Sequence, residues 1–329
     1  MSKRDKAKRF TKRLLTISLI VIVLFAGWLA YFFLSNDAPL LHGEVQYHIP
    51  FNSNQKLDVY YPTEDVYDNI PVVVFIHGGA WIGGDKVSVN NNRFNEAFNS
   101  LRDAGYAIVS SDYTLARNGE SPFPQNIVDS FDAMDWVQQN AEAYHFDLNN
   151  VTIFGESAGS HLGMMVAFAE PSDFGLNHKK LHPTCVVDVY GPSNLNTLYH
   201  RQAIDSLKTM IAQLPGRLKD QLNLPVLLFG FDPDEDPDRA QEVMNAFSPV
   251  TYLEANHGPV LMIHGNKDIV VPIEQSEELK YLFDSLGIGN EFHVLPGVDH
   301  AFRGATSSQK DSVQSWITDF ILANYQDLN

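Results

Sequence analysis

A five-residue motif near the middle of the chain has the residue types of an enzymatic nucleophile. Residues 155–159 read Gly-Glu-Ser-Ala-Gly, directly after the apolar run 151–154 and before a stretch with helical composition. A Gly-x-Ser-x-Gly motif between a strand and a helix is typical of a nucleophile elbow, in which the glycines allow a tight turn. Such a turn exposes the Ser157 hydroxyl at a helix N-terminus. Alone, the motif is also compatible with an ordinary glycine-rich turn, so its partner residues must be sought elsewhere.

A second glycine-rich segment has the pattern of an oxyanion-binding loop. The predicted strand 72–76 leads into HGGAW at 77–81. Adjacent glycines after a strand let backbone N–H groups face a pocket without interference from Cβ atoms. We therefore predict an oxyanion hole formed by the N–H groups of Gly78, Gly79 and Ala158.

A serine nucleophile also needs a base and a carboxylate that orients the base. Of the 12 histidines, His300 is the best candidate for the base, because a short loop connects it to the predicted strand 292–295. Asp268 follows the predicted strand 260–263 and is the candidate carboxylate. Asp299 precedes His300 directly, but adjacent side chains diverge, so we expect it to be a poor orienting group.

The three candidates occur in the chain order Ser157, Asp268, His300, which is the order used by α/β-hydrolases. His161 lies one helical turn after the serine, and we interpret it as a packing residue or a second-layer neighbour of the site.

The elements that must position these residues alternate along the chain. The predicted strands are 55–61 as an early edge strand, 72–76, 107–110, 151–154, 186–189, 260–263 and 292–295. The predicted helices are 92–104, 127–140, 158–169, 273–286 and 309–325. This alternation predicts an α/β fold with a doubly wound, mostly parallel sheet. Ligands of such folds bind at the carboxyl ends of the strands, where the candidate residues lie.

Residues 192–250 interrupt the alternation, and we expect them to form a small cap-like insertion over the carboxyl edge. An acidic turn at 232–238 lies within it. Alternating aspartates can bind calcium, but the glycine and distal glutamate of an EF-hand loop are missing. We favour a solvated turn whose Asp238 caps a helix starting at Arg239. No metal site is predicted.

The composition limits the class of protein. The chain has 329 residues, 44% hydrophobic and 19% charged, which fits one large α/β domain. The formal net charge of −17 argues against a nucleic-acid partner. The single cysteine, Cys185, lies in an apolar run and is expected to be a buried core residue.

The N-terminus has the pattern of a membrane anchor. Residues 1–13 hold seven basic residues and one acidic residue, and the next 21 residues, 14–34, carry no charge. A helix of that length spans the roughly 30 Å hydrocarbon layer. We predict a cytoplasmic segment 1–13, an uncleaved transmembrane anchor 14–34, a linker 35–44 and an extracytoplasmic domain 45–329. The alternative is a cleaved signal peptide and a secreted protein.

Taken together, the motifs resemble those of the α/β-hydrolase esterase/lipase superfamily over about residues 45–329. The group with an HGGxW oxyanion loop is the most similar, and it includes hormone-sensitive-lipase-like and feruloyl-esterase-like carboxylesterases. The matching segments are HGGAWIGGDK at 77–86, GESAGSHLG at 155–163, YGPSNL at 190–195, SPVTYL at 248–253, HGNKDIVVPIEQS at 264–276 and GVDHAF at 297–302. Two positions depart from the pattern. Ala80 replaces a usual glycine, and Thr114 stands where an arginine near the pocket is usual.

The resemblance implies hydrolysis of carboxylic esters through a Ser–His–Asp triad and an acyl-enzyme, without a metal or organic cofactor. Trp81, Glu156 and Tyr190 are candidate pocket residues. The expected substrates are small-molecule esters, acylated glycans or lipids outside the cytoplasm. An amidase, peptidase or formamidase on the same triad remains an alternative, and a non-catalytic membrane-tethered binding module is a further one. No oligomeric state follows from the sequence.

Overall fold

The computed structural model describes residues 43–90, 93–117, 120–199 and 224–327. Within these ranges no helix is long and apolar enough to cross a membrane. The predicted cytoplasmic segment 1–13, the anchor 14–34 and most of the linker lie outside the described residues, as do residues 200–223 of the predicted cap.

Eight strands form one sheet in the order β1-β2-β4-β3-β5-β6-β7-β8. The first two strands pair antiparallel, β2 also pairs antiparallel with β4, and all later pairs are parallel. The strands are β1 (Val45–Pro50), β2 (Lys56–Tyr60), β3 (Ile70–Ile76), β4 (Ala107–Ser111), β5 (Phe146–Glu156), β6 (Cys185–Val189), β7 (Val260–Gly265) and β8 (Asn290–Leu295). The predicted mostly parallel sheet is therefore present.

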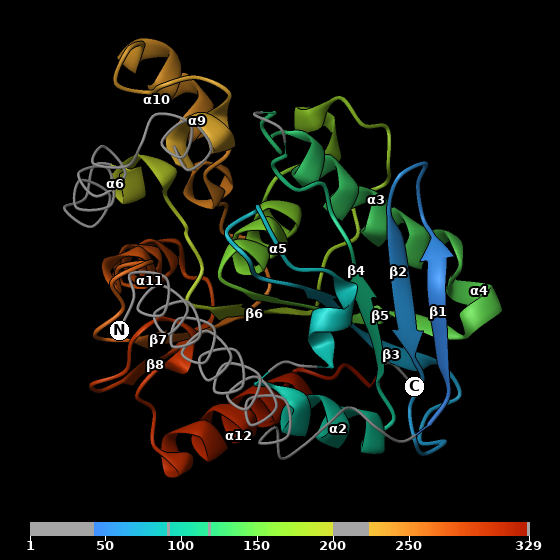
Figure 1. Cartoon of the computed structure of the whole chain (residues 1–329). Coiled ribbons are helices and arrows are strands. Elements are labelled where there is room, and N and C mark those ends of the chain that lie inside the picture. Colours follow the sequence, from blue (N-terminus) through green and yellow to red (C-terminus); the bar gives the residue numbers. More distant parts are fainter. Residues whose placement is uncertain (1–42, 91–92, 118–119, 200–223, 328–329) are drawn as a thin grey trace, which may run out of the picture. The chain divides into compact units, whose positions relative to one another are not determined.

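Helices cover both faces of this sheet (Figure 1). The α-helices are α2 (Asn95–Asp103), α3 (Gln125–Gln139), α4 (Ala141–Tyr144), α5 (Ala158–Phe168), α6 (Leu195–Tyr199), α9 (Leu224–Phe229), α10 (Pro237–Ala246), α11 (Glu274–Leu286) and α12 (Ser307–Ala323). Short 3-10 turns are η1 (Lys86–Val89), η2 (Pro171–Phe174), η3 (Pro249–Tyr252) and η4 (His300–Phe302).

Two hydrophobic cores lie on the two faces, and β3 shows how one strand supplies both. Val72, Val74 and Ile76 join the core beneath α3, α5 and α11. Val73 and Phe75 join the core beneath α2 and α12. Alternate residues of a strand point to opposite faces, so a strand between two helix layers is apolar at every position. This explains the continuous apolar runs in the sequence.

The predicted edge strand 55–61 is not the edge, which is a correction to the sequence-based topology. β2 occupies those residues, and β1 pairs with its outer side. The sequence of β1 is VQYHIP, with exposed Gln46, Tyr47 and His48 and no regular apolar alternation. Because one side of an edge strand is solvated, such a strand needs little apolar character, and the sequence analysis missed it.

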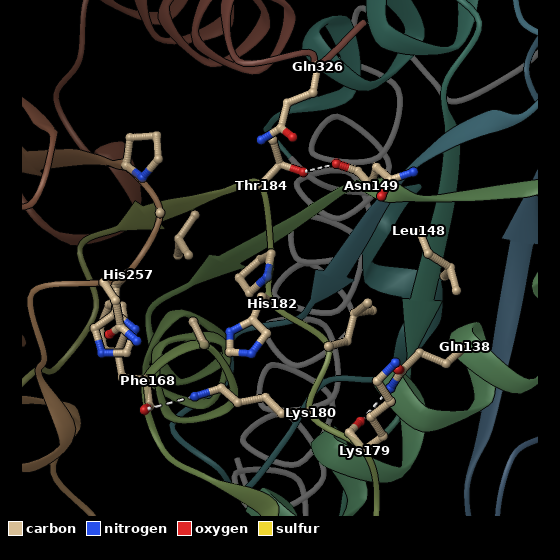
Figure 2. A pocket seen from close by; sticks show the side chains of 17 residues that line it. Gln138, Leu148, Asn149, Phe168, Lys179, Lys180, His182, Thr184, His257 and Gln326 are labelled. Carbon is tan, nitrogen blue, oxygen red and sulfur yellow. Dashed lines mark hydrogen bonds between the residues drawn. The ribbon is translucent and has the colours of Figure 1, made fainter. Parts of the chain in front are cut away.

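A cavity of about 560 Å³ opens at the amino ends of β5, β6 and β7 (Figure 2). Asn149, Thr184 and Pro259 line it where these strands begin, and Lys180 and His257 contribute polar side chains. The elements that carry Ser157, Asp268 and His300 leave the same sheet at the opposite, carboxyl edge. The cavity and the predicted site are therefore on different edges of the sheet.

Candidate active site

Ser157 lies between β5 and α5 in a backbone conformation that few residues adopt. Its φ and ψ are 51° and −121°. The turn also requires close approach by its neighbours, because a Cβ on Gly159 would lie 2.0 Å from the carbonyl oxygen of Ile76. The N–H of Ser157 donates to the carbonyl of Val189 at 2.9 Å, which ties the turn to β6. Strain held by surrounding structure is common at functional sites.

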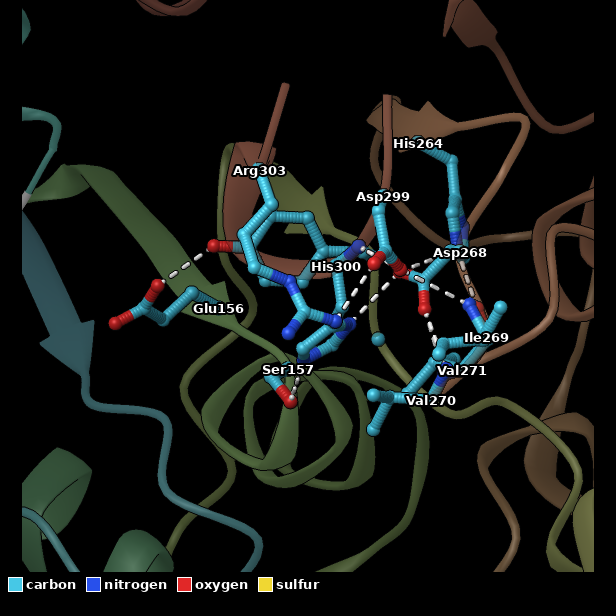
Figure 3. Close-up of polar contacts among 12 residues, drawn as sticks. Glu156, Ser157, His264, Asp268, Ile269, Val270, Val271, Asp299, His300 and Arg303 are labelled. Atoms are coloured by element: carbon cyan, nitrogen blue, oxygen red, sulfur yellow. Dashed lines mark hydrogen bonds and ion pairs between the residues drawn. The ribbon is translucent and has the colours of Figure 1, made fainter. Parts of the chain in front are cut away.

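The three predicted triad residues lie in one hydrogen-bonded series (Figure 3). The distance from Ser157 Oγ to His300 Nε2 is 3.1 Å, and that from His300 Nδ1 to Asp268 Oδ2 is 2.7 Å. The carboxylate stabilises a proton on Nδ1, so Nε2 is left to accept a proton from the serine hydroxyl. This arrangement can activate a serine for nucleophilic attack.

The Asp268 carboxylate is held by several donors. Its Oδ1 accepts hydrogen bonds from the N–H groups of Val270 at 2.9 Å and Val271 at 2.8 Å. Its Oδ2 contacts His300 and lies 3.4 Å from His264 Nε2. Burial alone would raise the pKa of Asp268, but the two histidines outweigh burial and lower that pKa to about 2. The group is therefore a carboxylate at neutral pH.

Asp299 does not orient the imidazole, in agreement with the sequence analysis. Its Oδ1 accepts the N–H of His300 at 2.7 Å and the N–H of Ile269 at 3.1 Å, and its Oδ2 pairs with Arg303 at 2.6 Å. Asp299 therefore connects the loop that carries Asp268 with the loop that carries His300, as Figure 3 shows.

The predicted oxyanion loop follows β3 and makes a tight turn. Gly79 has φ 124°, and a Cβ there would lie 2.1 Å from the carbonyl oxygen of Gly83. The Tyr113 hydroxyl donates to the carbonyl of His77 at 3.0 Å and supports the loop from β4's side. Ala158 is the first residue of α5, a position whose N–H has no partner within the helix. The predicted oxyanion donors therefore lie at the same edge of the sheet. Gly78 and Gly79 follow β3, and Ala158 begins α5.

The three candidate pocket residues are all buried. Trp81 is 5% exposed, Glu156 9% and Tyr190 1%. Trp81 packs against Phe123 and His161. Glu156 and Tyr190 hydrogen-bond to one another at 2.7 Å. Contact of these residues with a substrate stays a prediction.

His161 is a packing residue, as its position suggested. It is fully buried, and its Nε2 donates to the carbonyl of Phe247 at 2.7 Å. Burial lowers its pKa to about 4, so the ring is neutral at pH 7. Phe247 belongs to the predicted insertion, and its ring stacks on Phe123. The described part of the insertion therefore packs beside the first turns of α5.

The acidic turn gives a second correction. The residue that caps α10 is Asp236, whose carboxylate accepts the N–H of Arg239 at 3.3 Å. The predicted cap, Asp238, lies inside the first helical turn, because the helix begins two residues earlier at Pro237. Proline is favoured at the first helical position, where its missing N–H has no intrahelical partner.

Among the described residues, no group of three or more His, Cys, Asp or Glu is arranged to hold a metal ion.

Two residues near the site were missed by the sequence analysis. Arg93 forms an ion pair with Glu156 at 2.6 Å. His264 is fully buried behind Asp268, and its Nδ1 contacts the Ser276 hydroxyl at 2.8 Å. His264 begins the segment HGNKDIVVPIEQS at 264–276, so its place in that motif could have indicated a role near the site. Arg93 lies in no motif, and nothing in the sequence around it indicates a role.

The family model described as BD-FAE matches residues 57–283 of the chain. The chain belongs to the BD-FAE family. Among curated proteins, the esterase LipC of Mycobacterium tuberculosis is 25% identical over 263 residues, which cover 75% of this chain and 57% of LipC. The chain thus spans little more than half the length of that relative.

Solved structures share the fold. A truncated carbohydrate esterase from gut microbiota superposes with a TM-score of 0.65 at 23% identity, covering 85% of this chain and 97% of its own. The propionate-bound esterase Est2 of Thermogutta terrifontis has a TM-score of 0.63 at 20% identity, covering 86% and 94%. At these identities the likeness establishes the α/β-hydrolase fold, which confirms that part of the sequence-based prediction.

Proposed function

We propose that this protein is a serine hydrolase that cleaves carboxylic esters, with Ser157 as nucleophile, His300 as base and Asp268 as the orienting carboxylate. The observation that carries the proposal is the series of hydrogen bonds at 3.1 Å and 2.7 Å that links these side chains. Membership of the BD-FAE family and the esterase names of its relatives support the same reaction class.

In the proposed reaction, Ser157 Oγ attacks the ester carbonyl carbon while its proton passes to His300 Nε2. Backbone N–H groups of Gly78, Gly79 and Ala158 stabilise the negative charge on the carbonyl oxygen. Collapse of the tetrahedral intermediate breaks the bond to the alcohol, which takes the proton from His300 and leaves. Water then attacks the acyl-serine by the same steps and releases the carboxylic acid.

The substrates that we propose are small esters, including acylated glycans or lipids.

We also propose that residues 14–34 anchor the protein in a membrane with its catalytic domain outside the cytoplasm. The charge-free length of 21 residues after a basic segment supports this placement. Protease treatment of intact cells tests it, because an extracytoplasmic domain is cleaved without lysis. Protection until lysis would contradict the placement.

The test of the reaction compares Ser157→Ala with the wild-type chain on p-nitrophenyl esters of graded acyl length. We expect kcat/KM to fall at least about 10⁴-fold. Ser308→Ala is the matched control, since Ser308 is exposed on α12 and takes no part in the hydrogen bonds that link Ser157, His300 and Asp268. A fluorophosphonate probe should label the wild type and the control but not Ser157→Ala. Undiminished turnover by Ser157→Ala would remove the assignment.

A further inference from the structure

Glu156, directly before the predicted nucleophile, has a buried carboxylate that contacts buried Tyr190 and Arg93, whose side chain is 37% exposed. The side chain of Glu156 is 11% exposed. Its Oε2 accepts hydrogen bonds from Arg93 Nη1 at 2.6 Å and from the Tyr190 hydroxyl at 2.7 Å. A buried carboxylate without a cationic partner would be strongly disfavoured, so Arg93 has an electrostatic reason to be there.

Tyr190 connects Glu156 and Arg93 with the predicted base, His300. Its ring centroid lies 4.8 Å from that of His300, at an interplanar angle of 60°. Arg93 Nη1 also contacts the Tyr190 hydroxyl. Tyr190 has φ 44°, which is unusual for a bulky residue, and its N–H donates to the carbonyl of Ile263 at 2.9 Å. The ring is thus held at its hydroxyl and at its backbone, with one face of the imidazole beside it.

Glu156 also supports the predicted oxyanion loop. A Cβ placed on Gly78 would lie 3.1 Å from Glu156 Cγ and 3.4 Å from its Cδ. The side chain of Glu156 therefore lies against the backbone of Gly78. The carboxylate of Glu156 therefore contacts the predicted oxyanion loop. It also contacts Tyr190, whose ring lies beside the imidazole of His300.

The geometry points to a positioning role for Arg93, Glu156 and Tyr190. We propose that Tyr190 holds the imidazole of His300, that Glu156 anchors Tyr190 against the oxyanion loop, and that Arg93 neutralises the Glu156 charge beside that loop. This inference rests on the proposed function, since it concerns how the same serine site is kept ready for reaction.

The charges in this cluster have a predictable effect on His300. The described titratable groups around the imidazole are Asp268, Asp299 with its partner Arg303, Tyr190, His264 behind Asp268, and the Glu156–Arg93 pair behind Tyr190. An unbalanced carboxylate favours the imidazolium form of a nearby imidazole, whereas an unbalanced guanidinium disfavours that form. In the wild-type chain the two charges of the pair largely cancel.

Charge-removal variants of the full chain test the proposal through the pH dependence of kcat/KM. Its acid limb reports the pKa of the essential base in the free enzyme. Arg93→Met leaves Glu156 unbalanced, so we expect the acid limb to move up by about 0.5 pH unit. Glu156→Gln leaves Arg93 unbalanced, so the limb should move down by a similar amount. The double variant should return close to the wild-type profile.

Tyr190→Phe separates positioning from charge. It keeps the ring against His300 but removes the hydroxyl that Glu156 and Arg93 hold. We expect kcat to fall about tenfold with KM nearly unchanged, because the base is less well held while the substrate contacts remain. The acid limb should move less than in Arg93→Met.

The matched control is the exposed ion pair between Lys280 and Asp284 on α11, which has the same N–O distance of 2.6 Å. Lys280→Met and Asp284→Asn should leave the acid limb in place. Circular dichroism checks that each variant is folded.

The proposal is overturned if folded Arg93→Met and Glu156→Gln shift the acid limb in the same direction or not at all, or if the double variant is no closer to wild type. These failures are distinct from failure of the proposed function, in which Ser157→Ala would remain active and no serine-dependent profile would exist.

Discussion

The two edges of the parallel sheet differ in how much of their backbone is strained. Residues other than glycine with positive φ gather in loops after the carboxyl ends of β3, β5, β6 and β8. They are Ala80, Trp81, Ser157, Tyr190, Ala301 and Phe302. His145, before β5, is the one such residue described at the amino edge of the parallel strands. Strain has therefore been retained on the edge that carries the candidate chemistry.

The amino edge has polar groups of another kind. Lys180 Nζ donates to the carbonyl of Phe168 at 3.2 Å (Figure 2). It also donates to Glu170 at 3.0 Å, and His257 Nε2 contacts the carbonyl of Tyr252 at 3.1 Å. The contacts with Phe168 and Tyr252 satisfy backbone carbonyls at the ends of α5 and η3. A cavity alone therefore does not identify the candidate site. The candidate site is instead distinguished by the hydrogen bonds that link Ser157, His300 and Asp268.

Among the variants that test this difference between the two edges of the sheet, we expect the largest loss of kcat from a substitution of Asp268. Asp268→Asn keeps the size of the side chain but removes the charge that stabilises a proton on His300 Nδ1. We expect kcat to fall about 10⁴-fold while the protein stays folded. Asp299→Asn is the control, because Asp299 contacts backbone N–H groups and Arg303 and not the imidazole Nδ1. A loss at Asp299 equal to that at Asp268 would contradict the assignment.

A smaller loss is expected from Gly79→Ala in the predicted oxyanion loop. The added Cβ would meet the carbonyl of Gly83 at 2.1 Å, and the backbone has φ 124°, so the turn must shift. We expect kcat to fall about 10²- to 10³-fold with a lesser change in KM, since oxyanion donors act mainly in the transition state. Gly175→Ala is a control, because a Cβ there meets nothing within 4 Å, although its φ is also positive at 73°. Equal activity losses in both variants would count against a donor role for the Gly79 loop.

Protonation of Asp268 in acid should lower the free energy of unfolding of the protein. Its folded-state pKa is about 2 against an ordinary value of 3.8, so the folded state binds protons less readily than the unfolded state. The resulting contribution, about 2 kcal/mol, is present above about pH 4 and is lost as pH falls toward 2. Urea unfolding of the wild type and Asp268→Asn at pH 5 and pH 2.5 measures it. An equal pH dependence in both proteins would contradict the low pKa.

The smallest effect is expected at the amino edge. Lys180→Met keeps most of the aliphatic stem but removes the ammonium that pairs with Glu170, whose side chain is 56% exposed. We expect the free energy of unfolding to fall by about 1 kcal/mol or less, with kcat and KM within twofold of wild type. A tenfold change in kcat would show that the two edges are coupled and would weaken the comparison.

The proximity of Ser157, Asp268 and His300 could be predicted from the sequence because each lies in a local feature. Gly155 and Gly159 flank the serine within five residues, and Asp268 and His300 each follow an apolar strand by a short loop. Parallel topology then brings the ends of those strands together. The same reasoning placed both ends of β3, β4, β6, β7 and β8 within two residues of their observed bounds, whereas β5 begins five residues before its predicted start.

Arg93 could not be predicted, because its role depends on a contact with Glu156 that is 63 residues away in sequence. No periodicity or motif surrounds it. The α10 cap was assigned to the wrong aspartate because residues 232–238 offer several acidic candidates, and only the backbone conformation of Asp236 distinguishes it. Edge strand β1 was missed because a solvated edge requires no apolar pattern.

The support of Arg93 by the C-terminal helix has a consequence for how the site is completed during synthesis. Gln314, on α12, donates to the carbonyl of Arg93 and accepts the N–H of Ala97 at 2.8 Å. Ser157 precedes its base by 143 residues in the chain. A nascent polypeptide that has passed the turn at Ser157 therefore lacks both the proposed base, His300, and the helix that contacts the backbone of Arg93. Under the proposed function, ester hydrolysis would therefore begin only after synthesis has passed His300.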